Sequence, residues 1–174
     1  MSRGFWEQLN KPIIGLSPMD GVTDAAFRFI VAQIGKPSVM ITEFVSVEGM
    51  NVGNPEKVFI PFLYHEIERP IVAQVFGTTP EAFYQAAIMV GHMGFDGIDI
   101  NMGCPDRTIE KQGCGAAMMK DPENAVAVIR AAKQGIMDSG RDIPLSVKTR
   151  VGYNRDEIDT WIPTLLRENI AALT

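Results

Sequence analysis

The feature that most constrains the fold is a regular alternation of short apolar runs with helix-like segments along nearly the whole chain. The runs are apolar almost throughout, which is typical of parallel strands buried on both faces. Strands that alternate with helical segments indicate βα units and a parallel sheet covered by helices. The predicted strands cover residues 12–19, 38–47, 70–76, 96–102, 143–149 and 170–174.

Amphipathic segments with helix-start signals separate these strands. Thr23 is the predicted N-cap of the first helix, in which Phe27, Ile30, Val31 and Ile34 recur at helical spacing. We expect Phe27 to belong to the core, like the other aromatic residues of this half of the chain. The predicted helices cover residues 23–35, 79–94, 121–132 and 156–168, with a further short helix after Asn54-Pro55.

Two architectures fit such a series, a doubly wound open sheet and a (β/α)8 TIM barrel. Gln74, Asn101 and Lys148 lie inside or at the carboxyl ends of three different predicted strands. A barrel places its functional residues at the carboxyl ends of several strands, whereas an open sheet does so only near its switch point. The first strand is also not followed by a G-x-G-x-x-G turn. We therefore predict an α/β (β/α)8 TIM barrel, truncated after about five βα units.

Composition excludes several classes of protein. The chain is 46% hydrophobic, too much for a disordered protein, and no apolar run approaches the ~20 residues that span a bilayer. The net charge of −5 argues against broad electrostatic binding of nucleic acid by this chain alone. The first residues contain no apolar core of a secretory signal. The Cys-x9-Cys spacing of Cys104 and Cys114 matches no zinc motif. We expect a cytoplasmic protein without a metal or membrane partner.

The strongest chemical candidate is Cys104, in the segment Asp99-Ile100-Asn101-Met102-Gly103-Cys104-Pro105. Gly103 and Pro105 bracket the thiol where a strand becomes a loop, and we expect this position to expose the thiol at the barrel mouth. Such a thiol can act as a nucleophile or as a general acid toward a substrate carbon. The alternative is a small buried apolar residue, as most free cysteines are. We expect Cys114, in a glycine-rich loop, to be structural.

Polar residues on the neighbouring strands supply the remaining candidates. Asn101 carries a donor and an acceptor that suit the edge of a planar amide or imide, although it can also simply cap a turn. Lys148 and Arg150 lie on one face of the predicted strand at residues 143–149 and its end. Inside a barrel they need an anionic or electron-rich partner; the alternative is that they lie at a strand end on the surface. Gln74 needs a hydrogen-bond partner if it is buried, and Glu43 can neutralise either cation.

The turn after the first strand, Ser17-Pro18-Met19-Asp20-Gly21, can contact a flat ring through main-chain groups and a polarizable Met side chain.

Taken together, the candidate residues and the segments that carry them resemble the tRNA-dihydrouridine synthases. Matching stretches follow the family's order over about residues 12–174, and the DINMGCP segment with its downstream loop is the most specific of them. The matching stretches are SPMDGVTD, ITEFVSV, PIVAQVFG, DGIDINMGCPDRTIEKQGCGAAMMKDP and PLSVKTRVGY.

The resemblance implies an FMN-dependent barrel that reduces particular uridines of tRNA to 5,6-dihydrouridine, with NADPH as the reductant. Hydride would go to C6 of the base, and Cys104 would give a proton to C5. The substrate-binding residues would be Asn101 and Arg150. By the same match, the residues around FMN would be Pro18, Met19, Asp20, Gln74 and Lys148.

The resemblance also implies that residues 1–174 form the N-terminal part of the FMN-binding catalytic domain, without the last barrel strands and the helical tRNA-binding domain. We then expect this chain alone to bind FMN weakly or not at all, and its exposed strand edges to favour self-association. Two alternatives stay open. One is another FMN barrel, similar to dihydroorotate dehydrogenase, and the other is an inactive half-barrel that serves as a binding or dimerising module.

Overall fold

The computed structural model describes residues 3–52 and 58–174, so the short helix expected after Asn54-Pro55 lies outside the described residues. All its strands pair in parallel within one sheet of order β1-β2-β4-β5-β6-β7, and β3 pairs with β4. Each predicted strand contains one or two of these. They are β1 (Gly15–Leu16), β2 (Val39–Ile41), β3 (Val45–Ser46), β4 (Ile71–Phe76), β5 (Gly97–Met102), β6 (Leu145–Thr149) and β7 (Ala172–Leu173).

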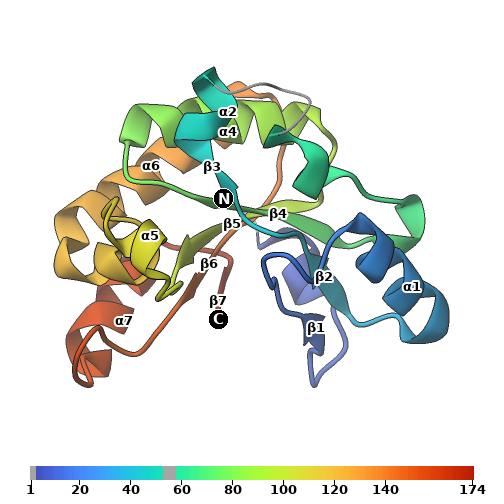
Figure 1. The fold of residues 1–174 in the computed structure, drawn as a ribbon, viewed down its shortest axis with the longest axis horizontal. Helices are drawn as coiled ribbons and strands as arrows, with labels where there is room; N and C mark the ends of the chain where they lie inside the picture. The colour runs from blue at the N-terminus through green and yellow to red at the C-terminus, as the bar shows by residue number, and fades with distance from the viewer. Residues whose placement is uncertain (1–2, 53–57) are drawn as a thin grey trace.

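Helices connect the strands and cover the outside of the sheet, as the βα pattern predicts (Figure 1). The helix expected at 121–132 runs six residues further, to Asp138. The α-helices are α1 (Ala25–Gly35), α2 (Val47–Val52), α4 (Pro80–His92), α5 (Arg107–Glu110), α6 (Pro122–Asp138) and α7 (Ile158–Arg167). The 3-10 helices are η1 (Gly4–Glu7), η2 (Ile60–Phe62), η3 (Glu66–Glu68) and η4 (Gly115–Lys120).

The sheet is curled into an open half-barrel. In Figure 1, α4 and α6 cover the side of the sheet drawn at the top, and β1 and β7 lie at the two ends of its curve. A cavity of about 320 Å³ is lined from both ends, by Gly15 and Leu16 of β1 and by Ala172 and Leu173 of β7. This arrangement confirms the predicted truncated (β/α)8 barrel and excludes the flat, doubly wound alternative.

The second predicted strand, residues 38–47, is interrupted. Its first part pairs Ile41 with Val72, and its second part pairs Val45 with Val75. Three residues, 42–44, therefore lie opposite two residues of β4, which is the register of a β-bulge with one extra residue. Bulges redirect side chains near functional sites, and here the bulged segment carries Phe44 to the carboxyl end of the sheet.

The core lies between the sheet and the long helices. The stripe of α4 that the sequence predicts is fully buried, including Phe83 and Val90. In α6, a Cβ added at Gly135 would lie 2.2 Å from the Tyr84 carbonyl oxygen of α4, so the glycine permits close packing of the two helices. In the part of the chain that the structure describes, no helix is both long and apolar enough to cross a membrane.

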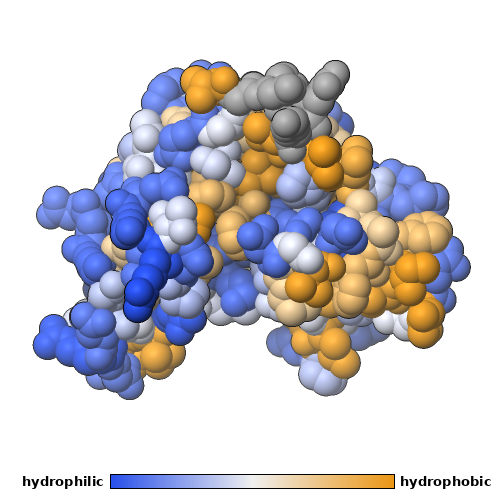
Figure 2. Space-filling model, in the orientation of Figure 1, coloured by the Kyte–Doolittle hydropathy of each residue, from blue (hydrophilic) through white to orange (hydrophobic). Residues whose placement is uncertain are grey.

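The first helix departs from the prediction in two ways. Its N-cap is Asp24, whose side chain accepts a hydrogen bond from the Phe27 amide, and not Thr23. Phe27 was predicted to be core but is 41% exposed, and Ile34 is 84% exposed. The buried face of α1 is instead occupied by Arg28, so the apolar face points outward (Figure 2, right).

Candidate active site

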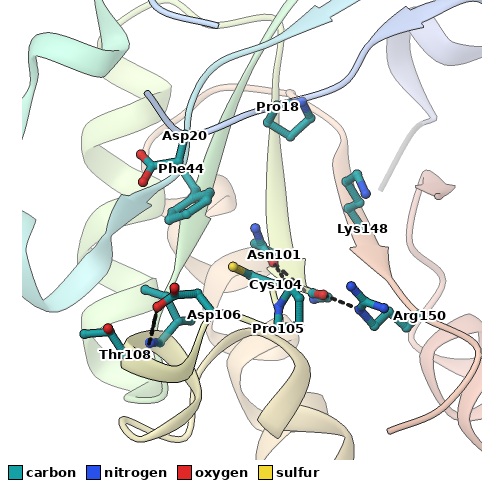
Figure 3. Close-up of a pocket in the computed structure, with 12 residues that line it drawn as sticks. Pro18, Asp20, Phe44, Asn101, Cys104, Pro105, Asp106, Thr108, Lys148 and Arg150 are labelled. Carbon is teal, nitrogen blue, oxygen red and sulfur yellow. Dashed lines mark hydrogen bonds between the residues drawn. The ribbon is translucent and has the colours of Figure 1, made fainter. Parts of the chain in front are cut away.

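A cavity of about 610 Å³ lies at the carboxyl ends of the strands (Figure 3). Parallel strands bring the ends of β5 and β6 to one edge, and the turn after β1 and the bulge before β3 complete the wall. That edge is where barrel proteins carry their functional residues. The lining residues are Pro18, Asp20, Phe44, Asn101, Gly103, Cys104, Pro105, Asp106, Thr108, Ile109, Lys148 and Arg150.

The turn after β1 is held by side chains rather than left free. The buried Thr23 hydroxyl accepts a hydrogen bond from the Met19 amide at 2.9 Å. Glu43, in the bulge, accepts one from the Gly21 amide at 2.6 Å. Glu43 thus binds the turn, whereas the sequence suggested that it neutralises Lys148 or Arg150. The result is a fixed loop that presents Pro18 and Asp20 to the cavity.

Asn101, at the end of β5, is 8% exposed and anchors the loop that carries the thiol. Its Oδ1 atom accepts hydrogen bonds from the Gly103 amide at 3.1 Å and from the Cys104 amide at 3.0 Å. The turn-capping role is therefore confirmed. Because Oδ1 is used twice, the acceptor that the sequence suggested for a ligand is already occupied within the protein.

Behind Asn101 lies a buried polar cluster. Asn101 Nδ2 donates to Gln74 Oε1 at 3.1 Å, and Gln74 Nε2 donates to Asp99 Oδ2 at 2.7 Å. The Ser146 hydroxyl donates to Asp99 Oδ1 at 2.6 Å. Burial raises the pKa of Asp99 from 3.8 to about 6, against the opposing effect of the Ser146 and Gln74 hydrogen bonds and the Lys148 charge.

The two cysteines have different surroundings. Cys104 is partly exposed and lines the cavity, and the Ala116 amide donates to its carbonyl oxygen at 2.9 Å. Gly115 has a φ of +60° and lies so close beneath this loop that an added Cβ would be 2.6 Å from the same oxygen. Cys114 is buried, and that burial raises its pKa to about 11. The predicted exposure of the Cys104 thiol is confirmed, and Cys114 is buried, as a structural cysteine would be.

Two cations lie on one side of the cavity, as the strand periodicity predicted. Arg150 Nε donates to the Gly103 carbonyl oxygen at 2.6 Å and so steadies the Cys104 loop from the other side. Lys148 extends into the cavity from β6 (Figure 3), and among the described residues none hydrogen-bonds its ammonium group. An ammonium in such a place favours an anionic or electron-rich ligand.

The structure thus brings together most of the residues chosen from the sequence. Pro18, Asp20, Asn101, Cys104, Lys148 and Arg150 line the cavity. Met19 and Gln74 do not: Gln74 is fully buried behind Asn101.

Sequence reasoning missed the role of Asp99 in this cluster. Its spacing of two residues from Asn101 in an otherwise apolar strand was the available signal. It also missed Phe44 and Asp106, whose positions depend on the bulge and on the short helix α5.

The curled parallel sheet defines the chain as part of a (β/α)-barrel protein. Its cavity lies at the carboxyl edge, where barrel enzymes have their active sites. A protein-family model described as dihydrouridine synthase matches residues 15–164. The chain therefore belongs to the dihydrouridine synthase family. This assignment favours the resemblance drawn from DINMGCP over a barrel similar to dihydroorotate dehydrogenase.

Curated relatives agree with the family. A "Probable tRNA-dihydrouridine synthase" of Staphylococcus aureus (strain COL) is 37% identical over 178 residues, covering 100% of this chain and 52% of the relative. "Probable tRNA-dihydrouridine synthase 2" of Bacillus subtilis (strain 168) is 38% identical over 176 residues, with the same coverage. The chain spans about half the length of the curated relatives it matches.

Proposed function

We propose that the protein to which this chain belongs reduces the C5–C6 double bond of specific uridines in tRNA, giving 5,6-dihydrouridine, in the cytoplasm. FMN would be its cofactor and NADPH its reductant. Residues 1–174 would form the N-terminal part of the FMN-binding barrel domain. The observation that carries the proposal is that Cys104, Asn101 and Lys148 line one cavity.

The cavity suits a flat, electron-rich cofactor. Its volume of about 610 Å³ is that of an ordinary small-molecule site, and Pro18 and Phe44 give it apolar walls. Pro18, Asp20 and Lys148 would hold FMN, with Met19 beside them on the same turn. Gln74 would act through Asn101, because it is buried behind that residue. When bound and reduced, FMN supplies a hydride equivalent for C6 of the base.

The protein's own groups would complete the reduction. The uridine must leave its stack to enter the cavity, as in other base-modifying enzymes. An Asn101 N–H donates to a uracil carbonyl oxygen, where negative charge develops as C6 gains hydride. The Cys104 thiol gives its proton to C5, and the resulting thiolate recovers a proton from water. Arg150, whose Nε holds the loop, has further N–H groups for the base or its phosphate.

The decisive test compares the two cysteines. The chain is expressed alone and together with the second half of the Bacillus subtilis relative, then given FMN, NADPH and a tRNA transcript that lacks dihydrouridine. With the second half present, we expect product from the wild type and from Cys114→Ala, and a loss of about 100-fold or more from Cys104→Ala. We expect no product from the chain alone. Equal activity of both variants would refute the role of Cys104.

Cofactor binding has its own test, independent of RNA. Flavin fluorescence is titrated with the wild type, Lys148→Met and Lys36→Met, each combined with the second half of the Bacillus subtilis relative. Lys36→Met removes an exposed cation at the end of α1. We expect Lys148→Met to weaken binding by about tenfold and Lys36→Met to leave it unchanged. An identical titration for all three proteins would remove Lys148 from the proposed site.

A further inference from the structure

A continuous chain of hydrogen bonds joins the buried carboxylate of β5 to the loop that carries the thiol. It runs from Asp99 through the amides of Gln74 and Asn101 to the Gly103 and Cys104 amides. Asp99 and Gln74 are 1% and 0% exposed, so water does not reach the bonds that join Asp99, Gln74 and Asn101. The donors and acceptors must therefore be matched within the protein.

The two ends of this chain fix the orientation of everything between them. At one end, an ionised Asp99 can only accept hydrogen bonds, and at the other, backbone N–H groups can only donate. Asn101 must therefore turn its oxygen to the loop and its NH2 group to Gln74. Gln74 must then turn its oxygen to Asn101 and its NH2 group to Asp99. No other arrangement of the two amides satisfies every group.

We propose that Asp99 is a positioning residue, whose buried carboxylate sets the orientation of the Gln74 and Asn101 amides and thereby anchors the Cys104 loop. This orientation of the Asn101 amide has a consequence for substrate specificity. Asn101 Oδ1 is occupied by two backbone amides, so the only polar group that Asn101 offers to the cavity is its remaining N–H. The site then favours a base that presents a carbonyl oxygen there over one that presents an amino group. That consequence rests on the proposed function, whereas the orientation itself does not.

The surroundings of Asp99 allow its protonation to be isolated. Its hydrogen-bond partners on β4 and β6, Gln74 and Ser146, are neutral. In the described part of the chain, Lys148 of β6 is the charged group that acts on it. Protonated Asp99 can still accept from Gln74, so the wild-type chain of bonds survives at either state of this carboxyl.

The test reverses the chain of bonds with two substitutions. Asn101→Asp alone places a carboxylate at each end of the Gln74 amide, which can donate to only one of them. Adding Asp99→Asn lets residue 99 donate to Gln74, which then turns its NH2 group to residue 101. We expect Asn101→Asp to lower the thermal midpoint by about 5 °C at pH 8, and Asp99→Asn/Asn101→Asp to recover most of that loss.

Thiol chemistry reports on the loop itself. In a Cys114→Ser background, iodoacetamide modification of Cys104 should accelerate by about tenfold in Asn101→Asp. Residue 101 can still accept from the two loop amides but loses its hydrogen bond to Gln74, so it holds the loop less firmly. The rate should return to the wild-type value in the double variant. The defect of Asn101→Asp should shrink as the pH falls to 5, since a protonated Asp99 can donate to Gln74. The double variant should show no such dependence.

Controls separate this coupling from general damage. Asn51→Asp removes a partly buried amide outside the cluster, one that donates to the Val47 carbonyl, and Asp99→Asn should not rescue it. In a Gln74→Met background the coupling between positions 99 and 101 should vanish. If Asn101→Asp does not fold, a folded double variant supports the proposal and an unfolded one overturns it. A double variant no better than Asn101→Asp also overturns it. These readouts need neither FMN nor RNA, so their failure is distinct from failure of the proposed function.

Discussion

A buried ion pair connects the fold to the site, and its removal is the most informative perturbation of stability. Arg28 Nε donates to Glu68 Oε2 at 2.8 Å, with the side chains 0% and 1% exposed. Arg28 Nη1 also donates to the Thr23 carbonyl oxygen at 2.8 Å. Since Thr23 holds the turn after β1, the pair supports the wall of the cavity formed by Pro18 and Asp20. We predict that Glu68→Gln destabilises the protein and loosens this wall.

The magnitude follows from what the substitution leaves behind. Glu68→Gln removes the negative charge but leaves the guanidinium of Arg28 in a site that excludes water. Breaking one partner of a buried pair typically costs about 3–5 kcal/mol. For a chain of this length, each kcal/mol lowers the thermal midpoint by about 2–4 °C, so we expect a decrease of about 10 °C. Arg28→Met/Glu68→Gln removes both charges and should recover at least half of that decrease.

The assay is thermal unfolding followed by circular dichroism, with Glu66→Gln as the matched control. Glu66 pairs with Arg69 at 2.7 Å but is 73% exposed, so its loss should change the midpoint little. If Glu68→Gln and Glu66→Gln give the same midpoint, or if the double variant is less stable than Glu68→Gln, the reasoning about the buried charge is wrong.

Three further predictions concern packing, pH and thiol reactivity. Gly135→Ala should destabilise the protein by about 2 kcal/mol or more in urea unfolding, because the new Cβ would meet the Tyr84 backbone; an unchanged midpoint would contradict the packing of α4 on α6. The pKa of Asp99, about 6, lies above its ordinary 3.8, so the folded state holds this proton more tightly. Stability relative to Asp99→Asn should therefore fall as the pH rises from 4 to 7, and a rise would contradict the burial argument. At pH 8, one equivalent of a thiol reagent should react quickly with Cys104, while Cys114, with a pKa of about 11, reacts slowly; mass spectrometry of the modified peptides decides this.

Much of the fold could be predicted from the sequence because hydrophobic periodicity reports burial directly. The stripe of α4 and the apolar strands needed no tertiary information. The bulge at residues 42–44 could not be predicted, since it depends on the register of two strands with β4. The prediction that the apolar face of α1 is buried was wrong for a related reason. Its apolar spacing is helical, but which face is buried depends on Arg28 finding Glu68, forty residues away.

The candidate site was predictable where single residue types carry chemistry. Cys104, Asn101 and Lys148 stand out at strand ends, and all three line the cavity. Their hydrogen-bond roles were less accessible, because these depend on which atoms face one another across strands. Gln74 was expected to contact the cofactor but lies behind Asn101, between that residue and Asp99.

The measurement that tests the central claim most directly is nucleoside mass spectrometry of tRNA treated with FMN, NADPH and the protein. The chain is supplied alone and with the second half of the Bacillus subtilis relative, as wild type, Cys104→Ala and Cys114→Ala. With the second half present, the account predicts dihydrouridine, two mass units heavier than uridine, for the wild type and Cys114→Ala, and its loss for Cys104→Ala. It predicts no dihydrouridine from the chain alone. Undiminished dihydrouridine with Cys104→Ala, or none with any combination that binds FMN, would contradict it.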